Sequence, residues 1–213
     1  MLTKRIQNGS DFKTGEKTME EIRQKKQEIR DEIIRKTSEM PPEQIAALTK
    51  AIEERLFEFA NYLESRIVLL YTPAQTEVDT MEIIRRSYLY NKIIVLPAFE
   101  ADSRKARLYK VDDLSKDLIP GVRGNLEPNP KRCKAVPLDC LDIAIIPGLS
   151  MDEKGGRIGL GKGCYDRLIP DLPITTRKVG LIFEAQMVPT IPIESHDKHV
   201  DIVITENRII YKI

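Results

Sequence analysis

Apolar residues recur at helical spacing between about residues 19 and 63. Between about Met19 and Lys36 the apolar positions are isoleucines in an otherwise charged sequence. After Pro41 and Pro42 a longer apolar stripe follows: Ile45, Leu48, Ile52, Leu56, Phe59 and Leu63. Side chains at this spacing share one face of a helix. The pattern therefore predicts a pair of N-terminal amphipathic helices, the second of which faces the core.

Beyond residue 66 the apolar residues form short unbroken runs instead. These runs predict strands at 67–71, 92–97, 141–147, 178–183 and 200–205. Continuous β-branched runs separated by helical stretches, such as the one expected at 79–90, are typical of strands buried on both faces of a mostly parallel sheet. A last run at 208–212 predicts an edge strand. The proline-rich segment 104–137 predicts an excursion over the sheet with one strand at 108–111.

Together these patterns predict a single α/β domain. We expect a three-layer α/β/α arrangement over residues 19–213, around a mostly parallel sheet and with the helical pair at its N-terminal end. Residues 1–18 are polar and predict a flexible lead-in. A chain of 213 residues is long enough to bury one sizeable core.

Composition and charge exclude several classes of partner. The chain is 41% hydrophobic and 31% charged, with a formal net charge of +1, so no bulk charge draws it to nucleic acid or to an anionic membrane. No apolar run approaches the roughly 20 residues that span a bilayer, and the N-terminus lacks the apolar centre of a signal peptide. Three cysteines and two histidines form no CxxC or zinc pattern, which suits a reducing compartment. We expect a cytoplasmic protein, monomeric or weakly dimeric, without nucleic-acid or membrane partners.

Ligands of open α/β sheets bind beyond the carboxyl ends of the strands. Segments at 71–80, at the glycine-rich stretch after Ile146 and at 194–199 occupy such positions. The stretch GGRIGLGKGCYDR at 155–167 is the most specific of them, because it holds five of the eleven glycines. Alternating glycines at 159, 161 and 163 permit positive φ and allow backbone N–H groups to form an anion-binding concavity.

Two familiar phosphate-binding patterns do not fit this stretch. A P-loop fails at Gly163, where Ser or Thr is needed to hold Mg²⁺, and a Rossmann loop fails at Cys164. Arg157 and Lys162 nevertheless supply positive charge, and Asp166 offers a carboxylate for a metal ion. The residues alone predict a phosphate site with Mg²⁺, and leave a plain surface loop as the alternative.

The stretch also resembles a family signature. The sequence PGLSMD at 147–152 followed by GRIGLGKGCYDR at 156–167 is similar to the signature of the 5-formyltetrahydrofolate cyclo-ligase (5,10-methenyltetrahydrofolate synthetase) family. Further blocks follow the family's order along the chain: KQEIR at 26–30, EVDT at 77–80, GNLEP at 124–128, FEAQ at 183–186 and HDKHVD at 196–201. Each block is weak alone, but their order and coverage make the resemblance specific.

The resemblance implies a ligase of folate one-carbon metabolism. Members convert 5-formyltetrahydrofolate to 5,10-methenyltetrahydrofolate with ATP and Mg²⁺, and release ADP and phosphate. Transfer of the γ-phosphoryl group to the formyl oxygen makes that oxygen a leaving group, and N10 of the folate then attacks the activated carbon. The implied partners are a reduced folate and ATP, with Mg²⁺ as cofactor.

The resemblance also implies roles for residues of this chain. Lys26 and Arg30, on one face of the first helix, are expected to reach the ATP phosphates. Their alternative is a solvated helix surface. The glycine loop completes the implied ATP-binding set: Arg157, Gly159, Gly161, Lys162, Gly163, Tyr165 and Asp166. Catalysis is implied for three members of that set: Arg157, Lys162 and Asp166.

Metal and folate binding are implied for four residues. Asp166 and Asp197 are expected to hold Mg²⁺, which usually takes one or two protein carboxylates. Glu77 is expected to accept hydrogen bonds from the folate, and Tyr165 to pack beside the ligands. The alternatives are a turn residue at Asp197 and a helix N-terminal charge at Glu77.

Departures from the family pattern keep two other functions open. Cys164 stands where most relatives carry an aromatic residue, and Ala106 lies in a segment expected to wall the folate pocket. A paralogous ATP-using enzyme with another substrate is one alternative. A nucleotide-binding regulatory module without turnover is the other.

Overall fold

A computed structural model describes residues 11–74, 76–100, 102, 105–121, 124–161, 163–194 and 197–212, with side chains from residue 19 onward. The helices are α1 (Asp11–Ser38), α2 (Pro42–Glu58), α3 (Ala60–Glu64), α4 (Met81–Leu89) and α5 (Cys164–Leu168). Short 3₁₀ helices lie at η1 (Leu138–Cys140), η2 (Ile169–Asp171) and η3 (Glu184–Gln186).

The described residues form one large sheet in the strand order β12-β11-β10-β7-β1-β2-β3-β6. Its strands are β1 (Ile67–Leu69), β2 (Ile93–Phe99), β3 (Ala106–Lys110), β6 (Lys134–Ala135), β7 (Ile143–Pro147), β10 (Arg177–Leu181), β11 (Ile202–Ile204) and β12 (Ile209–Tyr211). The five from β11 to β2 in this order pair in parallel, and the outer pairs are antiparallel. The predicted α/β fold with a mostly parallel sheet is confirmed.

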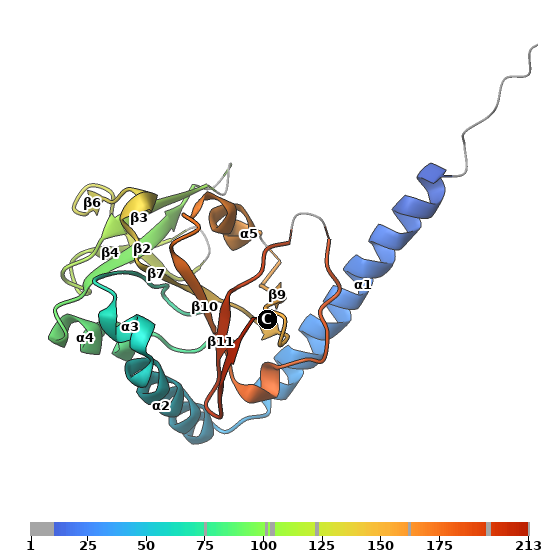
Figure 1. The fold of residues 1–213 in the computed structure, drawn as a ribbon, viewed down its shortest axis with the longest axis horizontal. Helices are drawn as coiled ribbons and strands as arrows, with labels where there is room; N and C mark the ends of the chain where they lie inside the picture. The colour runs from blue at the N-terminus through green and yellow to red at the C-terminus, as the bar shows by residue number, and fades with distance from the viewer. Residues whose placement is uncertain are drawn as a thin grey trace, which may run out of the picture.

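The N-terminal helical pair is present, with two differences in its bounds. The first helix begins at Asp11, so residues 11–18, which we expected in a polar lead-in, are helical. The sequence of these turns, DFKTGEKT, has no apolar period and contains a glycine and two threonines, which are weak helix formers, so neither periodicity nor propensity could reveal this part of the helix. The second stripe is divided at Phe59, whose extended backbone (φ −75°, ψ 115°) separates α2 from α3. Figure 1 shows the first turns of α1 extending away from the sheet.

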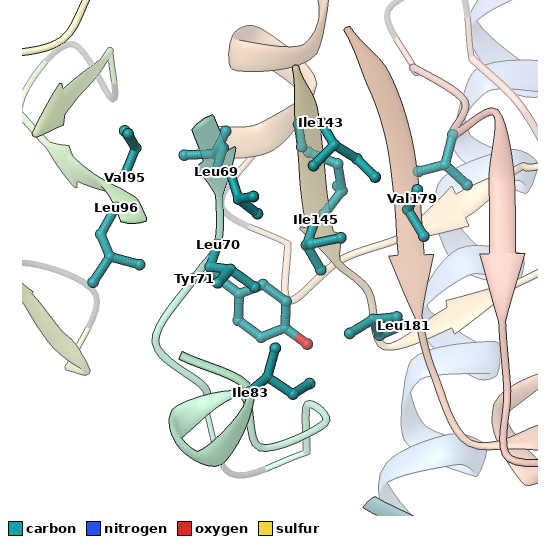
Figure 2. Packing of buried hydrophobic residues seen from close by; sticks show 14 of the residues in the cluster. Leu69, Leu70, Tyr71, Ile83, Val95, Leu96, Ile143, Ile145, Val179 and Leu181 are labelled. Atoms are coloured by element: carbon teal, nitrogen blue, oxygen red, sulfur yellow. The ribbon is translucent and has the colours of Figure 1, made fainter. Parts of the chain in front are cut away.

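The core lies on both faces of the parallel strands. All five residues of β7 are buried, and because successive side chains of a strand point to opposite faces, both faces of the sheet are covered. Figure 2 shows side chains from β1, β2, β7, β10 and α4 gathered in this core. The continuous apolar runs in the sequence reflect this double burial.

The proline-rich excursion contains more structure than its sequence predicts. It supplies β3, which pairs with β2, and a separate hairpin of β4 (Leu118–Pro120) and β5 (Leu126–Pro128). A second small hairpin joins β8 (Ser150–Met151) to β9 (Arg157–Ile158), which lies near the start of the glycine-rich stretch. Strands of two or three residues are too short to show a period of two, so neither hairpin was expected.

The strand order places a topological switch between β1 and β7. From β1 the chain builds outward through β2 on one side, and through β7, β10 and β11 on the other. Crevices at such points are the usual ligand sites of open α/β sheets. Within the described part of the chain, no helix combines the length and apolar character that crossing a membrane requires.

Candidate active site

A cleft of about 260 Å³ opens at the switch point. Ala74 and Glu77 line it from the segment after β1, and Pro147 lines it from the end of β7. Its other described walls come from α1, the β4–β5 hairpin, the glycine loop, α5 and the segment before β11: Arg23, Lys26, Arg30, Asn125, Arg157, Ile158, Gly159, Leu160, Gly161, Gly163, Cys164, Tyr165, Asp166, Glu194 and Asp197. The three segments expected to carry ligands therefore surround one cleft.

A buried carboxylate shapes the hairpin that leads into the glycine loop. Asp152 is 1% exposed, and its Oδ1 accepts the backbone N–H groups of Lys154 (3.0 Å) and Gly156 (2.8 Å). Its Oδ2 accepts the N–H of Ile191 at 2.8 Å. One side chain thus fixes the β8–β9 turn and ties it to the segment that carries Glu194 and Asp197.

Glycine is required in the loop for two different reasons: backbone conformation at some positions and space for a neighbouring side chain at another. Gly161 (φ 89°) and Gly163 (φ 65°) adopt the left-handed conformation that the alternating pattern predicts. Gly159 does not: it is absent from the positive-φ glycines of the described chain. A Cβ there would lie 2.8 Å from Nη1 of Arg157, so Gly159 leaves room for that guanidinium.

Arg157 is a buried cation directed at a carboxylate. It is 5% exposed, and it donates to the carbonyl oxygen of Pro147 at 3.2 Å and to Oδ1 of Asp166 at 2.5 Å. Its Nε has no hydrogen-bond partner among the described residues. Asp166 lies in the first turn of α5, just after Gly163, and is half-buried. Arg157 therefore orients Asp166 at the mouth of the loop.

Helix α1 brings two further cations to the cleft. Lys26 Nζ lies 2.9 Å from Oε2 of Glu194 and also donates to Oδ2 of Asp197. Arg30, one turn further along the helix, donates from Nε to the carbonyl oxygen of Gly159 at 3.0 Å. The expected alternative of two solvated charges is therefore wrong for Lys26, which is only 5% exposed. The two side chains share one helical face, as their spacing predicts.

Glu77 is held at the cleft by the turn that contains it. Its Oε2 accepts the N–H of Ala74 at 2.9 Å, and its own N–H donates to the Ala74 carbonyl oxygen at 3.0 Å. The same segment is folded back by the Tyr71 hydroxyl, which donates to the Val78 carbonyl oxygen at 3.1 Å. Burial raises the pKa of Tyr71 well above its usual value, so this hydroxyl stays a donor.

The aromatic and thiol side chains of α5 form part of the wall. Tyr165 is 5% exposed and packs edge-on against Phe99, with ring centroids 5.5 Å apart. Cys164, beside it, is also buried. Tyr165 thus forms part of the wall next to the loop.

Most of the predicted site residues line this one cleft. Lys162 lies outside the described residues, as does His196 of the C-terminal motif. Glu194, Arg23 and Asn125 line the cleft without having been named individually. Glu194 falls in the segment 194–199, which its position beside the predicted strands had indicated, whereas no local pattern distinguishes Arg23 from the other charges of α1. No cluster of three or more His, Cys, Asp or Glu side chains within the described ranges is placed to hold a metal ion.

A charged cleft at the switch point of an α/β sheet is typical of an enzyme that binds a small anionic ligand. The sequence pattern of the 5-formyltetrahydrofolate cyclo-ligase family matches residues 22–206. The chain belongs to this family of enzymes.

The sequences of individual relatives align with this chain over nearly the whole length of each relative. The 5-formyltetrahydrofolate cyclo-ligase of Mus musculus is 26% identical over 192 residues, which cover 85% of this chain and 94% of the mouse protein. A probable 5-formyltetrahydrofolate cyclo-ligase of Caenorhabditis elegans is 28% identical over 201 residues, covering 90% and 98%.

Solved structures share the fold. The Aquifex aeolicus 5,10-methenyltetrahydrofolate synthetase superposes with a TM-score of 0.76 at 28% identity, over 88% of this chain and 92% of that one. A 5,10-methenyltetrahydrofolate synthetase from Mycoplasma pneumoniae, at 18% identity and a TM-score of 0.67, supports the fold alone.

Proposed function

We propose that the protein converts 5-formyltetrahydrofolate to 5,10-methenyltetrahydrofolate in a Mg²⁺-dependent reaction that consumes ATP and releases ADP and phosphate. One observation carries the proposal. Glu77 from the segment after β1, the glycine loop with Arg157 and Asp166, and Lys26 with its partner Asp197 all line a single cleft. Family membership supplies the reaction, and the cleft supplies groups suited to each part of it.

The charges of the cleft suit a nucleotide that carries a metal ion. The described lining has four cations (Arg23, Lys26, Arg30 and Arg157) and four carboxylates (Glu77, Asp166, Glu194 and Asp197). Bare ATP therefore meets no net attraction from these side chains. Mg²⁺ takes one or two protein carboxylates and completes its shell with phosphate oxygens and water. When bound, it would offset the negative charge of the transferred phosphoryl group.

The buried donor of the loop supports an anion at the same place. Arg157 Nε lacks a partner in the described chain, and a buried donor without an acceptor costs about 1–3 kcal/mol. An oxygen of a bound phosphate would satisfy it. We propose that Asp166, oriented by Arg157, and Asp197 are the metal-binding carboxylates.

The main task of the protein's side chains would then be to position ATP and the folate relative to each other. Lys26, Arg30 and the loop N–H groups would hold the phosphates, while Glu77 would accept N–H donors of the pterin ring. This alignment brings the formyl oxygen in line with the γ-phosphorus, and such preorganisation contributes much of the rate in phosphoryl transfer. The formyl oxygen leaves with the phosphoryl group after N10 attacks the carbon, so one phosphate is released per ring closed.

The test is the rate of methenyl formation, followed by ultraviolet absorbance. Asp166→Asn and Lys162→Ala should each lower kcat by about tenfold or more, because each removes charge from the transferring group's surroundings. Asp171→Asn, a matched change at an exposed carboxylate five residues on, should leave kcat unchanged. Near-normal rates in both site variants would contradict the assignment of the loop.

A further inference from the structure

Lys26 is a buried ammonium with two carboxylate partners. Its Nζ donates to Glu194 at 2.9 Å and to Asp197, and the side chains of Lys26 and Glu194 are only 6% and 7% exposed. The residue expected to bind ATP phosphates is therefore already neutralised. So is Asp197, which is expected to bind the metal ion.

The Glu194 side chain has its own contacts with α1, separate from those of Asp197. Its Oε1 lies 3.3 Å from Nε of Arg23, one turn before Lys26 on α1, while its Oε2 faces Lys26. Its backbone forms a turn with Asp197, whose Oδ2 accepts the Glu194 N–H at 2.7 Å. If Asp197 left Lys26, the ammonium would still have a buried carboxylate beside it. This matters because a buried charge without a partner is strongly destabilising.

We propose that Glu194 is a positioning residue for Lys26: it holds the ammonium at the cleft while Asp197 turns from Lys26 to the metal ion of MgATP. The inference rests on the proposed function, since it takes MgATP as the ligand. Lys26 with Arg23 and Glu194 would then carry one net positive charge toward the phosphates. In the ligand-free protein, the same four side chains sum to zero (Arg23, Lys26, Glu194 and Asp197).

The experiment measures ATP binding by calorimetry without folate, once with Mg²⁺ and once with a chelator. In Asp197→Asn, Lys26 loses a competing carboxylate and the metal loses a ligand. Metal-free ATP should therefore bind about fivefold tighter, and MgATP about fivefold weaker, than in the wild type.

Glu194→Gln separates the proposal from a plain charge effect. A carboxylate that acted only as nearby negative charge would, once removed, tighten binding of both ATP forms. A positioning residue gives the opposite result: Lys26 keeps Asp197 as its single carboxylate partner, so MgATP binds about fivefold weaker and metal-free ATP does not bind tighter. Tighter binding of both forms would overturn the proposal.

A double variant tests whether Glu194 and Asp197 act on the same ammonium. Under the proposal, Glu194→Gln combined with Asp197→Asn removes both carboxylate partners of the buried Lys26, so MgATP binding should weaken by more than the sum of the two single effects, whereas independent effects would only add. Glu28→Gln, at an exposed carboxylate of the same helix, is the matched control and should change neither affinity. If Glu194→Gln does not fold, Glu194→Asp keeps the charge but shortens the side chain, and should weaken MgATP binding in the same direction.

Different results would contradict the proposed function and the proposed role of Glu194. A wild type that binds neither form of ATP contradicts the proposed function. A wild type that binds MgATP and forms methenyltetrahydrofolate, with a Glu194→Gln variant that binds both forms more tightly, contradicts only the role of Glu194.

Discussion

Individual side chains of the cleft act in pairs. Arg157 directs Asp166, and Lys26 is shared between Asp197 and Glu194. Each pair joins a cation suited to phosphate with a carboxylate suited to a metal ion. A ligand that brings both charges, such as MgATP, can satisfy the two members of each pair at once. Under the proposed function, the cleft would therefore bind the nucleotide and its metal ion together more tightly than either alone.

The left-handed backbone conformation of Gly155 leads to a prediction about the stability of the fold. Gly155 has φ +79°, and a Cβ there would lie 2.2 Å from the carbonyl oxygen of Val200. Gly155→Ala should lower the free energy of unfolding by about 3 kcal/mol or more, because a backbone clash adds to left-handed strain. Gly124 has φ +87° with open space around it, so Gly124→Ala should cost only about 1–2 kcal/mol from strain. Urea denaturation of both variants compares the two losses, and equal losses would show that the contact with Val200 is unimportant.

Residue types were predictable in this site, whereas their contacts were not. The motif resemblance pointed to Arg157, Asp166, Lys26 and Asp197, and all four line the cleft. Spacing along the chain gave no sign that Gly159 makes room for Arg157, because this depends on how the β8–β9 hairpin folds back. The pairing of Lys26 with Glu194 joins residues 168 positions apart, which no local pattern reports.

At the scale of elements, the cleft depends on how short segments are tied to the sheet. The 3₁₀ helix η3 contacts α1 and is joined to the turn before β12. There Glu184 accepts hydrogen bonds from Arg208, with Nη2 at 2.7 Å, and from the Thr205 hydroxyl at 2.7 Å. This link ties η3, which α1 contacts, to the turn between β11 and β12 at the edge of the sheet.

The Glu184 link predicts a pH-dependent stability. Hydrogen bonding to Arg208 lowers the pKa of Glu184 below its ordinary value of 4.5. A carboxylate with a lowered pKa stabilises the fold above its ordinary pKa, and this contribution is lost as the pH falls through the folded-state pKa. Glu184→Gln should therefore cost about 1 kcal/mol at pH 7, and the difference from wild type should shrink as the pH falls below the ordinary pKa of a glutamate and through the lowered pKa of Glu184. Thermal unfolding at pH 7 and at acid pH checks this.

The control for this prediction is Glu64→Gln, at an exposed carboxylate at the end of α3. It should cost little at either pH. A Glu184→Gln loss that persisted unchanged at acid pH would mean that packing, and not charge, makes this link.

Long elements were predictable and short ones were not. The helical pair and the parallel strands follow from apolar stripes and unbroken apolar runs, and they occur near the expected positions. The break at Phe59 was missed because the apolar stripe continues through it. The β4–β5 and β8–β9 hairpins were missed because their strands have three or fewer residues, too few to show the alternation of apolar and polar residues that identifies a strand. Both hairpins border the cleft, so the least predictable elements shape the site.

At the scale of the whole molecule, the topology collects the site from distant parts of the chain. Lys26 and Asp197 are 171 positions apart, yet they are hydrogen-bonded at the carboxyl edge of the sheet. The predicted parallel sheet indicated that the segments after β1 and β7 and before β11 would meet there, since parallel strands end at one edge. The contribution of α1 came instead from the motif resemblance, because nothing in a charged helix indicates which face meets a ligand.

The central claim is that this cleft couples ATP consumption to closure of the folate ring. The most direct test supplies purified protein with 5-formyltetrahydrofolate, ATP and Mg²⁺, and measures the methenyl product by its absorbance and ADP in the same samples. The account predicts that the two rise together in a ratio of about one to one, and that neither rises when Mg²⁺ is chelated. ADP formed without the methenyl product would contradict the assigned substrate. ATP bound without any ADP formed would contradict the assignment of an enzyme.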